Sequence, residues 1–466
     1  MQRFLHFKAF AEHRQVFVTV ELTAAAAAYQ DFHSARAITS LQATFKERVY
    51  QTIGLITDLV GAAMDYHEDW EAIPRPPFGE HFRRTHFSMD PRVTVLDCVR
   101  YPVTPNVVRK ASRAWELCIH SDPVLWRIKA YRARLFQTAS RLASRLNCSV
   151  GDVQLHATLQ QALATVLKHL PWIPGVDTIL LVETEAVAGS ICSQLASRRG
   201  ITVHRAHFRY PITPLEMIEA FRSCLDRYNP KVVIMSLVTT SGDILPLSKF
   251  VQEAQHHGSL IVLEGSEALG QISLNVGQCG ADYFVAKADG YMYCPPGVSV
   301  LVAAPQRQRS LSTLTVSYYY GQGYGEEWTY TGLVDQSTWV CIMQSLEFFK
   351  IITNGATDYL HDLARRGHDF LCETWKVPPL RQSNASSAVF AVLLPLKGAT
   401  SAVDALHVTA LLAQQGIAVS VTPVEWIFTP PPPSLRGGAL GGGGYANAAI
   451  VGGTAAAAGG LPSTTH

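Results

Sequence analysis

Several polar and charged side chains follow short apolar runs in this chain, at positions where a sheet would present them to a ligand. Glu264 comes directly after Leu260-Ile-Val-Leu263, and Lys287 follows the run Tyr283-Phe-Val285. A carboxylate at the end of a buried strand is a candidate ligand group, and it is equally typical of a helix cap. Glu264 is therefore a candidate site residue with both interpretations open.

Two other patterns predict no chemistry. His204 and His207 have the spacing of helix-borne metal ligands, but they lie in or beside a strand-like run, so we expect no metal site. Gly321-Gln-Gly-Tyr-Gly325 resembles a phosphate loop, but it does not connect a strand to a helix, which favours a flexible loop. The chain contains no G-x-S-x-G and no H-E-x-x-H, which excludes the simplest hydrolases.

Short apolar runs rich in β-branched residues must position these side chains. The runs are Thr178–Val182, Ile201–Val203, Val232–Val238, Leu260–Leu263, Tyr283–Val285 and Val298–Val302, and helical stretches such as 214–228 and 247–257 separate several of them. Strands buried on both faces have this composition, and their alternation with helices predicts a layered α/β sheet. Ligands bind beyond the carboxyl ends of such strands, so the residues after each run should form one site.

Composition limits the classes of partner. The chain has 466 residues, of which 48% are hydrophobic and 16% charged, enough for one or two large cores. A net charge of +2 is too close to neutral to favour nucleic acid or a membrane surface, so a small molecule or another protein is the expected partner. The nine cysteines have no C-x-x-C spacing, which indicates reduced thiols.

The same composition predicts a soluble, cytoplasmic protein. No apolar run approaches the ~18 to 20 residues that span a bilayer. The first ten residues are basic and amphipathic, as in a mitochondrial transit peptide, but Glu12 and Glu21 interrupt the acid-poor character of such peptides. A mitochondrial location is therefore the minor alternative.

Four regions follow from the pattern along the chain. Residues 1–90 are expected to form a helical N-terminal extension, because apolar residues recur every three or four positions from Leu41 to Val60. That amphipathic helix would pack on the chain's own body or bind a partner. A large domain is predicted for 91–339 and a small α+β C-terminal lobe for 340–428, followed by a disordered Pro/Gly/Ala-rich tail at 429–466.

The stretch from Gly280 to Gly297 reads G-A-D-Y-F-V-A-K-A-D-G-Y-M-Y-C-P-P-G. It resembles the G-A-D-x-x-x-x-x-x-H-K-W-x-x-G-P-K-G segment of pyridoxal-phosphate (PLP) enzymes of the class V aminotransferase group, most like isopenicillin N epimerases. In that group, the lysine eight residues after the aspartate holds PLP as a Schiff base. Counting from Asp282 places Gly290 there, and glycine has no nucleophile.

The resemblance covers roughly residues 95–345 and implies a fold. It predicts a PLP-transferase-like large domain with a mixed, mostly parallel seven-stranded sheet and a small C-terminal lobe. It also implies a dimer, because this group builds each cofactor site from two chains, and an amino-acid-like ligand.

Further blocks of the resemblance imply cofactor-binding positions. Ala157 and Thr158 match the turn that binds the cofactor phosphate, and Thr184 falls where an aromatic ring stacks on the cofactor. Glu264 and Glu267 lie in Glu264-Gly-Ser-Glu-Ala-Leu-Gly270, which matches D-G-A-H-A-P-G, so that Glu264 replaces the aspartate that pairs with the pyridine nitrogen. Thr331 begins the block that would come from a neighbouring subunit.

Each block lacks part of the usual chemistry. Leu333 and Val334 stand where the group has a hydroxyl and a guanidinium, and aliphatic side chains cannot bind a phosphate. The block N-H-G-S-x-G matches Asp97–Pro102, which retains neither glycine, and the C-terminal arginine motif has no counterpart.

Two hypotheses follow. In the first, the chain is a non-catalytic relative that keeps the fold and the dimer surface and acts as a scaffold, a regulator or a partner of an active paralogue. In the second, it is an active PLP enzyme, of epimerase, lyase or aminotransferase type, that uses Lys287 or altered chemistry.

Overall fold

A computed structural model describes residues 4–11, 14–21, 70, 72–184, 186–206, 208–332, 334–352, 354–382, 387–395, 402–423 and 448–453. The chain divides into two units, Met1–Asp65 and Tyr66–His466. In the first unit, β1 (Phe4–Ala11) and β2 (Arg14–Glu21) form an antiparallel hairpin.

The hairpin differs from the helical extension that the sequence predicted for residues 1–90. Valine and phenylalanine crowd β2, and these residue types favour a strand over a helix. The amphipathic segment from Leu41 to Val60, on which the helical prediction rested, lies outside the described residues.

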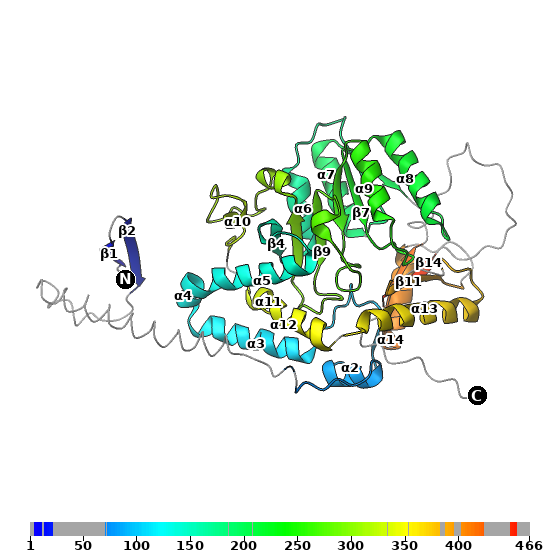
Figure 1. Cartoon of the computed structure of the whole chain (residues 1–466), viewed down its shortest axis with the longest axis horizontal. Helices are drawn as coiled ribbons and strands as arrows, with labels where there is room; N and C mark the ends of the chain where they lie inside the picture. The colour runs from blue at the N-terminus through cyan, green and yellow to red at the C-terminus, as the bar shows by residue number, and fades with distance from the viewer. Residues whose placement is uncertain are drawn as a thin grey trace, which may run out of the picture. The chain divides into compact units, whose positions relative to one another are not determined.

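A seven-stranded sheet forms the centre of the second unit, in the order β4-β10-β9-β8-β7-β5-β6 (Figure 1). Its strands are β4 (Val153–His156), β5 (Thr178–Val182), β6 (Thr202–Ala206), β7 (Val232–Ser236), β8 (Leu260–Glu264), β9 (Tyr283–Lys287) and β10 (Ser299–Ala303). Neighbouring strands from β9 to β6 are parallel, whereas β10 runs antiparallel to both β9 and β4. The predicted mixed, mostly parallel sheet is confirmed.

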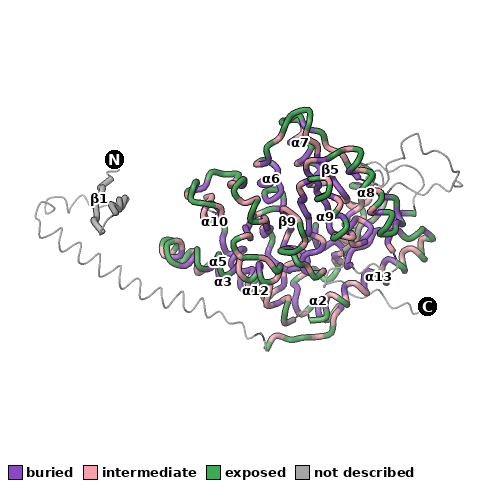
Figure 2. Tube along the Cα trace, turned by 45° about the horizontal axis from the view of Figure 1, so that its top comes forward, coloured by how far each residue is buried: buried purple, intermediate pink, exposed green. Residues whose placement is uncertain are grey.

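Helices cover both faces of this sheet. On one face, α6 (Leu159–His169) and α7 (Ala186–Arg199) pack on side chains such as Ile179 and Leu181. On the other face, α5 (Tyr131–Leu146), α8 (Pro214–Tyr228) and α9 (Leu247–His256) pack on Leu180 and Val182. Because successive strand residues point to opposite faces, strands buried on both sides need continuous apolar runs, and Figure 2 shows the buried interior that results.

Shorter elements complete the second unit. They are α2 (Glu80–His86), β3 (Thr94–Val95), α3 (Asn106–Ser121), α4 (Pro123–Leu125), η1 (Trp126–Ala130), η2 (Val150–Asp152), η3 (Val276–Gln278), η4 (Pro305–Ser310), α10 (Tyr324–Glu327), α11 (Ser337–Val340), α12 (Ile342–Glu347) and η5 (Phe348–Ile352). No helix in the described ranges is long and apolar enough to cross a membrane.

The small lobe contains helices α13 (Ala356–Trp375) and α14 (Ala402–Gln414) and a three-stranded sheet. That sheet has the order β11 (Val389–Leu393), β14 (Ala448–Gly453), β13 (Ser420–Pro423), with antiparallel pairs throughout. Its middle strand, β14, lies within the segment predicted to be disordered from residue 429. Small side chains do not prevent a strand there, because β14 pairs with two neighbours through its backbone.

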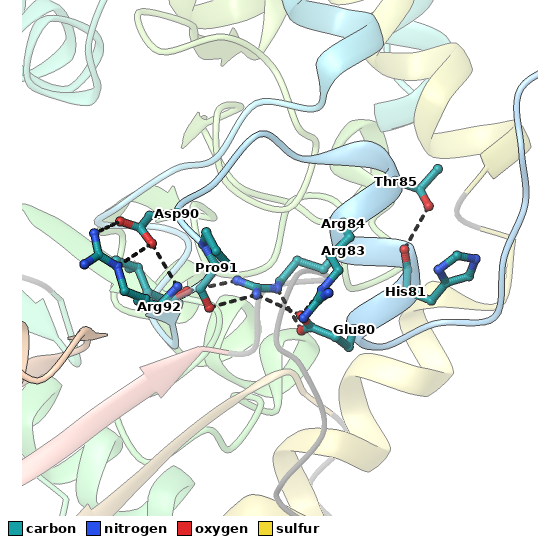
Figure 3. Close-up of polar contacts among 9 residues, drawn as sticks. Glu80, His81, Arg83, Arg84, Thr85, Asp90, Pro91 and Arg92 are labelled. Atoms are coloured by element: carbon teal, nitrogen blue, oxygen red, sulfur yellow. Dashed lines mark hydrogen bonds and ion pairs between the residues drawn. The ribbon is translucent and has the colours of Figure 1, made fainter.

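The amino-terminal part of the second unit joins the small lobe. β3 pairs in parallel with β12 (Ile417–Ala418), so residues 94–95 associate with the lobe predicted for 340–428 and not only with the large domain predicted for 91–339. Arg83 of α2 holds the approach to β3, because its guanidinium donates to the carbonyl oxygens of Pro91 and Val93 at 3.3 and 3.0 Å (Figure 3).

Candidate functional site

The carboxyl ends of the strands bring several predicted residues to one edge of the sheet. Ser299, at the start of β10, pairs with His156 at the end of β4 and with Lys287 at the end of β9. Ser236, which ends β7, pairs with Glu264, which ends β8. His156, Ser236, Glu264 and Lys287 therefore lie along one side of the sheet, at the carboxyl ends of its strands, which we call the strand-end edge. The sequence predicted such a shared edge, although β4 was not among the predicted runs.

Glu264 is held tightly by its neighbours at this edge. Its side chain is buried, with a residue exposure of 3%. Oε2 accepts a hydrogen bond from Ser236 Oγ at 3.1 Å, and Oε1 accepts one from the backbone N–H of Ser266 at 2.8 Å. The carboxylate thus caps the turn that follows β8 and not a helix, and its predicted role toward a ligand stays a prediction.

The turn between β4 and α6 contains the predicted phosphate-binding positions. Thr158 is the N-cap of α6, and its Oγ1 accepts a hydrogen bond from the N–H of Gln161 at 3.1 Å. The N–H of Ala157 donates to Gln161 Oε1 at 3.2 Å. Both polar groups therefore serve the local helix start in this structure.

His156 precedes this turn as a buried imidazole. Burial lowers its pKa to about 4, so it is neutral near pH 7, and its Nε2 has no hydrogen-bond partner among the described residues. A neutral imidazole carries no charge with which to bind a phosphate.

The segment after β5 contains Glu183 and Thr184. Glu183 has a φ of 53°, a left-handed conformation that is uncommon for a residue other than glycine. The pKa of its carboxyl is raised to about 7, chiefly by burial and to a smaller extent by the carboxylate of Asp243, against the opposing effect of hydrogen bonds such as that of Tyr210. Thr184 Oγ1 is buried and has no hydrogen-bond partner among the described residues.

Lys287 and Gly290 meet the segment Asp97–Arg100 at the same edge. Lys287 Nζ donates to the carbonyl oxygen of Val99 and lies 3.6 Å from Oδ1 of Asp289. Burial raises the pKa of Asp289, and the ammonium of Lys287 opposes that rise. Gly290 is buried, and a Cβ atom added there would stand 3.1 Å from Cγ2 of Val99.

The remaining predicted residues are less central. Glu267 is half-buried, and after burial it is the main cause of the raised pKa of the Cys98 thiol, so these two side chains are close. Thr331 is half-buried, and in the described part of the chain no hydrogen bond or ion pair joins it to the strand-end residues. Val334 is 47% exposed, and Leu333 lies outside the described residues.

Sequence reasoning missed Val99 and the pair Glu183 and Asp243. Val99 could have been found, because Asp97–Pro102 has larger residues where the matching block has glycines, and Gly290 has no side chain where the class V group has lysine. A loss of space in one segment thus accompanies a loss of side chain in the other. No signal existed for Asp243, whose carboxylate, distant in sequence, lies near enough to raise the pKa of Glu183.

The mixed seven-stranded sheet, the helices on both of its faces and the strand-end residues define an α/β protein with the PLP-transferase-like fold. The family description "Aminotransferase class-V" matches residues 154–421. This chain belongs to the class V aminotransferase family.

Named relatives agree with this assignment. The chain is 21% identical over 346 residues to the L-cysteine desulfhydrase-like protein lolT1 of Epichloe uncinata, covering 68% of this chain and 76% of that protein. It is 27% identical over 252 residues to isopenicillin N epimerase of Amycolatopsis lactamdurans, covering 51% and 60% of the two chains. Among solved structures, an apo cysteine desulfurase from Thermococcus onnurineus NA1 has a TM-score of 0.60 at 15% identity, covering 82% and 94%.

PLP is the cofactor of this family, and the strand-end edge fits it only in part. Glu264 ends β8 and Thr158 caps α6, and their predicted roles toward the ring and the phosphate stay predictions. Position 290 has no amine, Val99 lies against it, and Thr184 offers no aromatic face. The residues present therefore do not fit PLP held covalently through position 290.

Proposed function

We propose that this chain is a non-catalytic member of the class V aminotransferase family, which keeps the fold and acts as a scaffold, a regulator or a partner of an active paralogue. One observation carries the proposal: Gly290, which the resemblance aligns with the cofactor-binding lysine, is buried against Val99 with 3.1 Å between Cγ2 and an added Cβ. Glycine offers no nucleophile, and a side chain at position 290 would meet Val99 at a distance shorter than an ordinary van der Waals contact.

Lys287 supports the same conclusion through its contacts. Its ammonium donates to the Val99 carbonyl and lies 3.6 Å from Oδ1 of Asp289, so two neighbouring groups already engage Nζ. Its Cα also lies three residues before position 290, at the end of β9, so its side chain leaves the backbone at a different point.

An active PLP enzyme that uses Lys287 on an amino-acid-like substrate is the second candidate. Lys287 favours it because this lysine ends β9 at the strand-end edge and its side chain is 25% exposed. The two candidates differ in where PLP would be attached.

The deciding experiment is borohydride reduction of PLP-treated protein, followed by peptide mapping and a visible spectrum before reduction. We expect no PLP-dependent visible absorption at stoichiometric PLP and no adduct beyond scattered surface lysines. Lys287→Met is the matched control for any adduct found. A stoichiometric adduct on Lys287 that disappears in K287M would refute the proposal and establish the second candidate.

We also propose that the chain pairs with a second copy or with a paralogue. Large apolar side chains are exposed along one stretch from α4 to α5, with Val124 63%, Ile128 72% and Phe136 60% exposed. Beside them, the guanidinium of Arg132 lies 4.7 Å from the ring centroid of Tyr319. Exposed apolar side chains at such spacing favour a protein interface over free solvent.

A further inference from the structure

We infer that the segment Asp97–Arg100 is a built-in plug that crowds any side chain larger than glycine at position 290, and that the small lobe holds this plug in place. The inference rests on the proposed function in one respect, because it takes position 290 as the lysine position of the family. Val99 is the residue that crowds position 290, and hydrogen bonds to the small lobe hold it there.

The inner side of the plug contacts the strand-end edge at three points. Val99 is 2% exposed, and its Cγ2, Cα and Cβ atoms would stand 3.1, 3.6 and 3.7 Å from a Cβ at position 290. The Val99 carbonyl accepts a hydrogen bond from Lys287 Nζ. Cys98 is buried beside the hydroxyl of Tyr291, the residue that follows Gly290. The plug thus contacts position 290, the residue after it and the side chain of the lysine three residues before it.

The outer side of the plug is tied to the small lobe. Asp97 is 2% exposed, and its Oδ2 accepts hydrogen bonds from Ser420 Oγ of β13 and, at 3.0 Å, from Arg100 Nη1. Asp97 Oδ1 accepts from the N–H of Arg100 at 3.0 Å, which closes the segment into a turn. One residue earlier, the N–H of Leu96 donates to the Ala418 carbonyl oxygen at 2.8 Å.

The approach to the plug is braced as well. The buried guanidinium of Arg83 donates to the carbonyl oxygens of Pro91 and Val93, and Glu80 accepts from the same guanidinium at 3.0 and 3.1 Å (Figure 3). The chain therefore enters β3 at a fixed position, and β3 continues into the plug. Contacts with α2, β12 and β13 all restrain the plug. We therefore expect that a larger residue at position 290 displaces the plug only by weakening these hydrogen bonds.

Two consequences separate this inference from simple loss of a lysine. A side chain at position 290 and the side chain of Val99 compete for the same space, so their substitutions should be coupled. Restoring a lysine at 290 should also be insufficient for PLP capture while Val99 is present.

The first experiment measures the coupling by thermal unfolding of the full chain, without PLP. Gly290 does not need a left-handed φ, so Gly290→Ala changes the contact with Val99 and the entropy of the unfolded chain, and the second effect cancels in a double-mutant cycle. We expect G290A to lower the melting temperature by about 1 °C, the shift that ~1 kcal/mol produces in a chain of 466 residues. We expect V99A to remove most of that shift when the two are combined. Additive shifts would overturn the plug.

Gly151 provides the matched control for the cycle, because an added Cβ there meets nothing within 4 Å. G151A combined with V99A should give additive shifts. This cycle uses no cofactor, so it tests the plug even if the wild-type chain proves to bind PLP through Lys287.

The second experiment restores the lysine. G290K and the double variant V99G/G290K are treated with PLP and borohydride, and the adduct at position 290 is quantified by peptide mapping of protein that retains a cooperative melting transition. We expect at least about tenfold more adduct in the double variant, which corresponds to ~1.4 kcal/mol. Ser420→Ala in the G290K background should also increase the adduct, because it releases Asp97. Equal capture by G290K and the double variant would overturn the inference.

Discussion

Nζ of Lys287 lies 3.6 Å from Oδ1 of Asp289, a carboxylate that is 7% exposed. Lys287 ends β9, and Asp289 follows it after one residue, so this ion pair lies at the strand-end edge directly before Gly290. The ammonium of Lys287 therefore stabilises the fold at the strand-end edge by neutralising a buried carboxylate.

Lys287→Met should therefore destabilise the protein. Removing the ammonium leaves the buried Asp289 carboxylate without its counter-charge, at a cost of about 1–3 kcal/mol in the free energy of unfolding. Chemical denaturation measures this, with Lys287→Arg as the charge-retaining control. The double variant K287M/D289N should recover part of the loss, and a K287M variant as stable as wild type would contradict the assignment.

Glu183 should make stability depend on pH. Its folded-state pKa is about 7 against an ordinary value of 4.5, so the folded protein holds this proton more tightly than the unfolded chain does. The resulting stabilisation is full below about pH 4.5 and is lost as the pH rises through about 7. Glu183→Gln should remove this slope from the unfolding free energy, whereas Glu219→Gln, an exposed change on α8, should leave it. A slope unchanged in E183Q would exclude Glu183 as its source.

Thr158 should act first as a helix cap. Its hydroxyl accepts the N–H of Gln161 at 3.1 Å, so Thr158→Ala should cost about 1 kcal/mol of unfolding free energy in protein without any added ligand. Thr158→Ser keeps the oxygen and should remain near wild type. If T158A proved neutral, the hydroxyl would not be committed to α6.

Light scattering should detect a dimer at micromolar concentration, and charge placed on the α4–α5 surface should dissociate it. Ile128 is 72% exposed, and Ile128→Glu would put a carboxylate into the proposed interface. Leu215 on α8 is 73% exposed and outside that surface, so Leu215→Glu should stay dimeric. A monomeric wild type would count against the pairing itself.

The strand-end edge shows how far the sequence reaches into the site. The apolar runs that end at Glu264 and near Lys287 predicted two strands of the sheet, and Glu264 lies where that reasoning placed it. Local pattern sufficed there because a strand buried on both faces requires a continuous apolar run. β4, with only four residues and two of them polar, gave no such signal.

The carboxyl-terminal region shows where local pattern failed. The alanine- and glycine-rich segment that contains β14 has little side-chain surface to bury, so composition indicated disorder from residue 429. A strand in the middle of a sheet gains its backbone hydrogen bonds from two neighbours that are distant in sequence, here β11 and β13. Composition carries no information about such partners.

By itself, the sequence determined that this is a layered α/β chain of the class V aminotransferase family with glycine at position 290, because burial periodicity and residue identity are both local properties. Only the tertiary structure decided what stands beside that glycine. Val99 reaches it across 191 positions of sequence because β3 and the plug are tied to the small lobe, and packing between distant segments depends on the whole fold.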